Sequence, residues 1–211
     1  MFDELDGRFV EQLSEDWLKI RIGKVGASRL ADVMAKGRNG EPSATRENYK
    51  MELLTARLTG VYPETYQSEE MRRGIYLEDE AAEVYQARTF SEVKKCGWYP
   101  APDFAMAGAS PDRLVDDDGL VEIKCPNTKT HLDTLLNGKI DRKYILQMQW
   151  QMYCTGREWC DFVSYDDRLS GNIKIFIKRF YPDEKMLDEI KQAVDKFLNE
   201  LDELETKLRS M

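Results

Sequence analysis

Cysteine and histidine are scarce in this sequence, which holds four cysteines and one histidine among its 211 residues. The cysteines stand at positions 96, 125, 154 and 160. Their spacing is neither that of a paired C-x-x-C zinc site nor that of a dense disulfide framework. We therefore expect reduced, mostly structural thiols. The histidine, His131, follows Lys129-Thr130 in a predicted loop, where we expect it at the surface and without a catalytic role.

The chain also lacks long apolar runs, repeats and low-complexity tracts. No run approaches the ~18 apolar residues that are typical of a membrane span, so we expect no membrane partner. The acidic start, Met1-Phe2-Asp3-Glu4, lacks the apolar core of a signal peptide, and this favours a cytoplasmic location. A length of 211 residues suits one domain with a full core, so we predict a single domain over 1–211.

Charge is abundant, and it is unevenly distributed. Charged residues make up 33% of the chain and the net charge is −8. Residues 1–16 carry six acids and one base, and residues 183–211 carry nine acids and five bases. The remaining residues hold 24 acids and 25 bases. The acidity is therefore terminal, and the middle of the chain can keep a basic surface, for example at Arg72-Arg73 or Lys94-Lys95, that would permit binding to DNA.

Apolar periodicity and helix-ending residues predict a mixture of helices and strands. Ser28 is interpreted as the N-cap of a helix that contains Leu30, Val33 and Met34. Further helices are expected at about 45–58, 68–89, 143–155 and 183–209, and strands at about 93–99, 105–115, 120–125, 159–166 and 172–180. This order favours an α/β or α+β domain with a central mixed sheet flanked by helices.

The last predicted helix is amphipathic. Its apolar residues recur at steps of three and four: Leu187, Ile190, Val194, Phe197, Leu201, Leu204 and Leu208. Such a helix can cover its own core or pack on a neighbouring subunit, and the first is the more common arrangement. Three tryptophans are also expected in the core rather than as stacking platforms for bases, namely Trp98, Trp150 and Trp159.

A short hairpin carries the clearest chemical signal. Ser110-Pro111-Asp112 is followed after nine residues by Glu122-Ile123-Lys124, with an acidic turn ending in Gly119 between them. An Asp-Gly step between apolar strands predicts a hairpin. With a three-residue loop Asp112 would lie opposite Glu122, and with a two-residue loop it would be one place out of register. Because side chains alternate along a strand, Glu122 and Lys124 share one face, which we expect to carry the chemistry, while the other belongs to the core.

Two acids and a lysine on a hairpin also have a plain structural explanation. An exposed hairpin often carries a cross-strand ion pair of this kind. The apolar residues between the charged ones, together with Ser110-Pro111 just before Asp112, favour the chemical interpretation.

Glu78 supplies a third acid. The predicted apolar stripe of its helix comprises Met71, Ile75, Ala82 and Tyr85, and Glu78 falls on that stripe. A carboxylate on a buried stripe is unfavourable unless it is paired or bound to a cation. A salt bridge to an arginine would satisfy it. Taken together with Asp112 and Glu122, we interpret Glu78 as a third acid aimed at the same cation.

These segments resemble an ordered family signature. Gly74-x-x-x-Glu78, Ser110-Pro111-Asp112, Glu122-Ile123-Lys124-Cys125-Pro126 and Gln149-x-x-x-Tyr153 are similar to the motifs of the PD-(D/E)-x-K nuclease superfamily. Residues 17–21, with the Lys-Cys-Pro step, more narrowly resemble the phage lambda exonuclease type (YqaJ-like) of alkaline exonuclease. The similarity extends from about residue 17 to the last helix and implies a restriction-endonuclease-like core.

The resemblance implies roles for particular residues. Asp112, Glu122 and the carbonyl of Ile123 would bind Mg²⁺, with Mn²⁺ as a substitute and one or two ions per site. Glu78 would contribute to the metal site, and Lys124 would orient or deprotonate the attacking water. The full set of implied site residues is completed by Arg21, Ser28 and Ser110 on the 5′-phosphate and by Gln149 and Tyr153 as supports of the site.

The resemblance also implies an activity and partners. The protein would be a ring-shaped homotrimer of phage or prophage origin that degrades the 5′-ended strand of double-stranded DNA. It would require a 5′-phosphorylated end and would leave a 3′ single strand for a single-strand annealing protein. Two alternatives remain open: an end-independent endonuclease or repair nuclease of the same superfamily, and a non-catalytic subunit that binds DNA ends.

Elementary chemistry agrees with these roles. Mg²⁺ prefers hard oxygen ligands and keeps several waters, so two or three carboxylates suit it. A lysine near a cation in a partly buried site is expected to have a lowered pKa, which would make it a proton acceptor. Arg21 can hold a phosphate by two parallel hydrogen bonds. Taken singly, Arg21 is also compatible with an ordinary surface arginine and Ser28 with a plain cap, and only their occurrence as a set favours a phosphate pocket.

Overall fold

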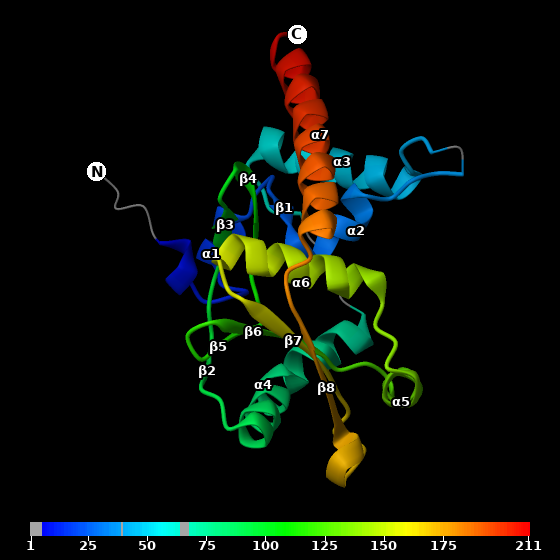
Figure 1. Ribbon diagram of the computed structural model, residues 1–211. Coiled ribbons are helices and arrows are strands. Elements are labelled where there is room, and N and C mark those ends of the chain that lie inside the picture. Colours follow the sequence, from blue (N-terminus) through cyan, green and yellow to red (C-terminus); the bar gives the residue numbers. More distant parts are fainter. Residues whose placement is uncertain (1–5, 39, 64–67) are drawn as a thin grey trace.

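The protein folds as a mixed α/β structure around a five-stranded sheet, as expected (Figure 1). The computed structural model describes residues 6–38, 40–63 and 68–211. Its helices are α1 (Glu15–Ile20), α2 (Leu30–Val33), α3 (Ala44–Thr59), α4 (Glu69–Thr89), α5 (Thr128–Asn137), α6 (Arg142–Thr155) and α7 (Glu184–Arg209). Its strands are β1 (Val25–Gly26), β2 (Val93–Lys94), β3 (Tyr99–Ala101), β4 (Phe104–Ala109), β5 (Arg113–Val115), β6 (Gly119–Lys124), β7 (Trp159–Tyr165) and β8 (Ile175–Phe180).

The larger sheet has the order β2-β5-β6-β7-β8, and β1, β4 and β3 form a second, three-stranded sheet. In the larger sheet β6 and β7 run parallel, and the other neighbours are antiparallel. The chain passes from β6 to β7 through α5 and α6, because a parallel pair requires a long crossover connection. Helices α6 and α4 lie on opposite sides of this sheet (Figure 1).

The two faces of the central strand β6 have different apolar neighbours. Val121 and Ile123 pack with Ala81 and Tyr85 of α4. Leu120, on the other face, packs with Met148 and Met152 of α6 and with Phe162 of β7. Both faces of β6 are therefore covered, as is usual where strands pair in parallel.

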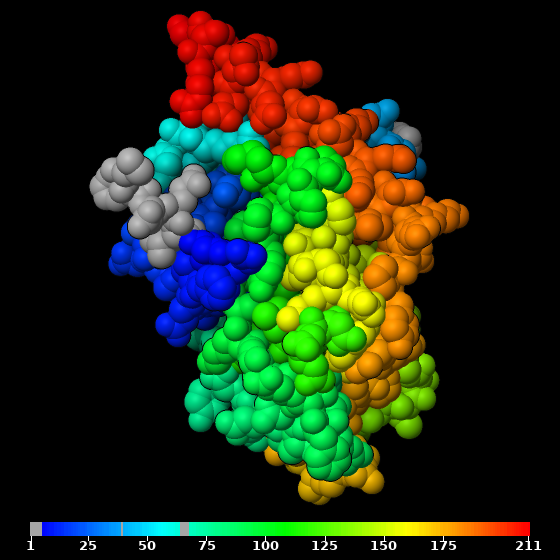
Figure 2. Space-filling view, turned by 60° about the vertical axis from the view of Figure 1, so that its left-hand side comes forward, coloured from blue at the N-terminus to red at the C-terminus, as the bar shows by residue number. Residues whose placement is uncertain are grey.

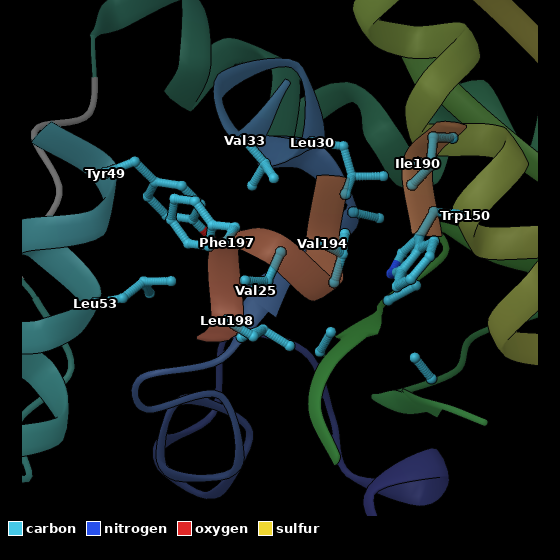
Figure 3. Packing of buried hydrophobic residues seen from close by; sticks show 14 of the residues in the cluster. Val25, Leu30, Val33, Tyr49, Leu53, Trp150, Ile190, Val194, Phe197 and Leu198 are labelled. Atoms are coloured by element: carbon cyan, nitrogen blue, oxygen red, sulfur yellow. The ribbon is translucent and has the colours of Figure 1, made fainter. Parts of the chain in front are cut away.

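A second core joins α2, α3, α6 and α7 to the three-stranded sheet (Figure 3). The apolar side of α7 contributes Ile190, Val194, Phe197, Leu198 and Leu201, all of which are buried. The Phe197 ring stacks on Tyr49 of α3 at 5.7 Å between centroids. The last helix therefore covers its own core, and Leu208 near its end stays 43% exposed.

Local signals set several helix ends. The Ser68 side chain caps α4 by accepting a hydrogen bond from the Met71 amide. Gly60 and Gly156 end α3 and α6 in the left-handed conformation, at φ 68° and 70°. A glycine adopts this conformation without a steric penalty, which is why it commonly terminates helices. Trp98, Trp150 and Trp159 are buried, as expected.

Other local predictions are wrong. Ser28 is exposed inside a 3₁₀ turn, Ala27–Arg29, and is not the N-cap of α2. The strand expected over 105–115 is two strands, because the chain leaves the sheet between β4 and β5. His131 lies in α5, where it is fully buried. Its Nδ1 is 2.7 Å from Ser164 Oγ and its Nε2 is 2.9 Å from the Ile173 carbonyl oxygen, so tertiary partners far along the chain hold the ring inside.

Within the described residues, no helix combines the length and the apolar character that crossing a membrane requires. The N-terminal residues, blue in Figure 2, lie against the green segments of the chain. Residues 8–13 line a pocket of about 490 Å³ together with Ile75, Glu78 and Arg113. This pocket brings the start of the described chain to α4 and to the hairpin strand β5.

Candidate active site

The β5–β6 hairpin places Asp112 opposite Glu122. Arg113 pairs with Val121 and Val115 with Gly119, which leaves a three-residue loop. Continuing the register by one residue puts Asp112 across from Glu122, as predicted for that loop length. The Ile123 amide donates a hydrogen bond to Asp112 Oδ2 at 2.6 Å. The two acids are thus fixed side by side by the backbone of the hairpin.

Glu122 is a fully buried carboxylate on the central strand. Its Oε1 contacts Lys124 Nζ in an ion pair, and its Oε2 accepts a hydrogen bond from Gln151 Nε2 at 2.6 Å. We expected one face of β6 to carry the chemistry and the other to belong to the core. Helix α6 covers the face that carries Glu122, so both faces of β6 are buried at this residue. Lys124, at the end of β6, keeps 26% of its side chain exposed, so the site opens where β6 ends.

The charges of this group perturb one another. Burial, and then the Glu122 carboxylate, raise the pKa of Asp112 well above its usual range. Burial lowers the pKa of the Lys124 ammonium, but Glu122 and Asp112 outweigh this effect and leave the pKa raised. Two carboxylates stabilise the charged form of Lys124 here, and the lowered pKa expected for this lysine beside a bound cation stays a prediction. Lys124 is an ammonium here.

Glu78 lies near this group but is satisfied by an arginine. Arg113 Nη1 is 2.6 Å from Glu78 Oε1, and Arg113 Nη2 is 2.5 Å from Asp79 Oδ1. Arg113 is buried, and Nη1 also donates to the carbonyl oxygen of Asp112 at 2.5 Å. Negative charge on Glu78 contributes to the raised pKa of Asp112. Glu78 is therefore close enough to act on Asp112, although its nearest cation is a guanidinium.

The buried stripe of α4 differs from the predicted one. It consists of Leu77, Ala81, Ala82 and Tyr85. Met71 and Ile75 are 55% and 42% exposed, so Glu78 stands at the edge of the stripe and not on it. The sheet selects a face of α4 that is rotated from the one expected.

The hairpin acids fit a hard divalent cation. Among the described residues, no three His, Cys, Asp or Glu side chains are placed to hold one ion. Two carboxylates, Asp112 and Glu122, do meet, and Glu122 Oε1 is in contact with Lys124 Nζ. Lys124 places an ammonium beside the two acids, and both carboxylates raise its pKa. Two carboxylates, together with the Ile123 carbonyl that the resemblance implies, would be the small oxygen donor set that Mg²⁺ accepts while it keeps several waters.

Arg21 stands in an aromatic cage and has no acidic partner among the residues that the structure describes. Its guanidinium lies 3.8 Å from the centroid of the Trp17 ring and 5.6 Å from the centroids of Trp98 and Tyr62. Burial lowers the pKa of Arg21, and the only ionisable groups of the described chain that oppose this are Tyr62 and Tyr49. A half-buried, unpaired guanidinium is a suitable site for an anion.

The structure brings Ser28 and Ser110 to the same region. Trp17 Nε1 donates to Ser110 Oγ at 2.9 Å, so Trp17 joins Ser110 to Arg21. Gly26 pairs with Gly108 across β1 and β4, which sets the Ser28 turn beside the end of β4. A Cβ added to Gly26 would lie 3.3 Å from Arg21 Nη2. The segments that carry Arg21, Ser28 and Ser110 therefore lie near one another, although they come from three parts of the chain.

Gln149 and Tyr153 do not contact the hairpin acids. Gln149 Nε2 donates to the Tyr181 carbonyl at 2.9 Å, and Gln149 Oε1 accepts from the Asp183 amide at 2.8 Å. Tyr153 donates its hydroxyl proton to Asp103 at 2.5 Å. The amide that reaches Glu122 belongs to Gln151, which sequence reasoning missed. Its place between Trp150 and Met152, in a helix whose methionines face the sheet, was the available signal.

Comparison with known proteins gives consistent matches. Residues 16–158 match the model of the YqaJ-like viral recombinase domain. The crystal structure of an alkaline exonuclease (LHK-Exo) from Laribacter hongkongensis is 46% identical, with a TM-score of 0.86 over 93% of this chain and 97% of that chain. The same protein in complex with dAMP gives a TM-score of 0.87 at the same identity and coverage.

A more distant match extends the fold similarity. A phage-related exonuclease from Haemophilus somnus 129PT is 16% identical, with a TM-score of 0.69 over 88% of this chain and 96% of that chain. Comparison with curated protein sequences gives no match. The structural matches confirm the predicted fold class, a nuclease-type core of mixed sheet and flanking helices.

Proposed function

The chain belongs to the YqaJ-like viral recombinase domain family, and from this we propose that it is a Mg²⁺-dependent exonuclease that degrades double-stranded DNA from 5′ ends. The observation that carries the proposal is the meeting of Asp112, Glu122 and Lys124 at the end of β6. The 46% identity to an alkaline exonuclease over 93% of the chain supports it. Digestion from 5′ ends would leave 3′ single strands for an annealing protein in recombination.

The hairpin residues would hold the cation and the scissile phosphate. Asp112, Glu122 and the carbonyl of Ile123 are the proposed ligands, and Glu78 would assist from α4. When bound, Mg²⁺ would stabilise charge on the scissile phosphate and lower the pKa of its water. Lys124, held as an ammonium by the two carboxylates, would donate hydrogen bonds that orient the water and the phosphate.

The second cluster would select the DNA end. Arg21, Ser28 and Ser110 are proposed to bind the terminal 5′-phosphate, because their neighbouring segments offer two hydroxyls and a guanidinium that has no acidic partner among the described residues. This cluster would bind the 5′ end of the DNA, and the hairpin residues would hydrolyse the phosphodiester. Together they would define the direction of digestion. We further propose the homotrimeric ring, which would retain the duplex between successive cleavages.

The test compares four substrates: linear duplexes with 5′-phosphate or 5′-hydroxyl ends, covalently closed circles, and single strands, each with and without Mg²⁺. The proposal expects loss of the 5′-phosphorylated linear duplex only when Mg²⁺ is present. Lys124→Ala should abolish digestion, while Lys207→Ala, an exposed lysine in the last turn of α7, should not. Equal cutting of closed circles would instead identify an endonuclease, and binding without hydrolysis would identify an end-binding subunit. The mass in solution tests the trimer.

A further inference from the structure

Gln151 touches Glu122 from behind the site. It lies on α6, is fully buried, and donates from Nε2 to Glu122 Oε2 at 2.6 Å. The other carboxylate oxygen, Oε1, contacts Lys124. The two oxygens of Glu122 thus have different neighbours: an amide on the helix side and an ammonium on the strand. A carboxylate held at one oxygen has little freedom to turn about its last torsion.

The position of Gln151 is itself fixed by packing. Its neighbours on α6, Met148 and Met152, are buried against Leu120 and Phe162 of the sheet. Helix α6 therefore cannot withdraw from β6 without opening this part of the core. The amide can bind Glu122 only through its NH₂ group, because a flipped amide would set Oε1 against the carboxylate.

This arrangement has a visible energetic penalty. Gln151 Oε1 is buried and has no hydrogen-bond partner among the residues that the structure describes. A methionine at this position would fill similar space without an unpaired acceptor, and such an unpaired group is ordinarily destabilising. A glutamine at position 151 is therefore better explained by its bond to Glu122 than by the stability of the core.

We propose that Gln151 is a positioning residue that fixes the carboxylate of Glu122 for a divalent cation. The inference rests on the proposed function, since it assumes that Glu122 is a metal ligand. Residues that hold a metal-binding side chain from outside commonly change metal affinity by about 10- to 100-fold when they are replaced. Gln151→Met should thus weaken cation binding while it leaves Asp112, Glu122 and Lys124 in place.

The experiment measures Mn²⁺ binding to the full chain without DNA, by calorimetry and by the electron paramagnetic resonance of free Mn²⁺. Thermal unfolding of each variant is recorded in parallel. Gln149→Met is the matched control: it is the same substitution on the same helix, and it removes two hydrogen bonds to the segment before α7. The expected result is a Mn²⁺ dissociation constant raised about 10- to 100-fold by Gln151→Met and unchanged by Gln149→Met.

A second variant guards against failure to fold. Gln151→Asn keeps the amide but shortens the side chain by one methylene group, so it should weaken binding in the same direction. Unchanged Mn²⁺ affinity in the folded Gln151 variants, with wild-type binding intact, would overturn the inference and leave the proposed function standing. Equal weakening by Gln149→Met would overturn it as well, since the effect would then be one of stability. Absence of cation binding by the wild type would refute the proposed function and the inference together.

Discussion

Replacement of Arg21 by glutamine separates binding of the DNA end from stability of the fold. The guanidinium stacks on Trp17 at 3.8 Å, a contact worth about 0.5–2 kcal/mol. Burial of the same charge opposes folding, and it lowers the pKa of Arg21. Because the two effects have opposite signs, the free energy of unfolding of Arg21→Gln should stay within about 1 kcal/mol of the wild type.

The effect on activity should be much larger. Hydrogen bonds to a charged group contribute about 1.5–3 kcal/mol, and 1.4 kcal/mol corresponds to about a factor of ten. The specificity constant kcat/KM for 5′-phosphorylated duplex should therefore fall by about 10- to 100-fold. For duplex with 5′-hydroxyl ends it should change little, since that substrate lacks the phosphate. Initial rates on the two substrates, measured at limiting DNA concentration, give both constants.

Two controls define the result. Arg21→Lys keeps the charge but loses the paired donors of the guanidinium, so it should give an intermediate loss. Arg88→Gln removes an exposed arginine that bonds only Asn172 among the described residues, and it should leave both constants unchanged. If Arg21→Gln lowers kcat/KM equally for the two substrates, or leaves both constants unchanged, Arg21 does not bind the 5′-phosphate and the reasoning fails.

Three further outcomes follow from other parts of the structure. Mg²⁺ at 100 times its dissociation constant should raise the free energy of unfolding by about 2.7 kcal/mol, an increase that a chelator reverses; identical melting curves with and without Mg²⁺ would contradict this. Gly119→Ala would place a Cβ 2.1 Å from the Trp159 ring, so it should destabilise by about 1–3 kcal/mol, seen as a lower Tm, whereas Gly74→Ala, whose Cβ meets nothing within 4 Å, should not. Burial raises the pKa of Glu200, but hydrogen bonds from two cations of α3 outweigh it and set the pKa at about 2. The stability from Glu200 is therefore complete above the unfolded pKa of 4.5 and is lost as pH falls toward 2; Glu200→Gln should flatten the acid side of the stability–pH curve, and parallel curves would exclude this role.

Local rules predicted the elements that local chemistry determines. The three residues between β5 and β6 fix the register that sets Asp112 across from Glu122. Capping by Ser68 and the left-handed glycines at positions 60 and 156 fix three helix ends. None of these needs a distant partner, and the sequence predicted the two glycine ends, while it left the hairpin register open between a two-residue and a three-residue loop.

The errors arose where a distant partner decides. The buried face of α4 is chosen by β6 and β7, and the sheet selects Leu77 over Ile75. Glutamines occur at positions 147, 149 and 151 of α6, and only the position of Glu122 shows that Gln151 is the one that reaches the site. His131 is buried because its ring makes a hydrogen bond with Ser164, which lies 33 residues away in the sequence. The raised pKa of Lys124 likewise depends on how closely the two carboxylates approach it.

The acidic turn between β5 and β6 has a consequence for how this chain tolerates change. Residues 116–118 are exposed and take no part in the proposed chemistry, so substitutions at Asp117 should be harmless. Asp116 is more constrained, because it has a φ of 45° and its side chain accepts a hydrogen bond from the Glu92 amide. The number of residues in the turn is constrained, because one inserted or deleted residue would shift the hairpin register. Asp112 would then move away from the Ile123 amide, and side chains of one strand would point to the opposite face of the sheet. The turn is thus more constrained in length than in the identity of its central residue, and variation among related chains should keep the gap between the two acids constant while position 117 changes freely.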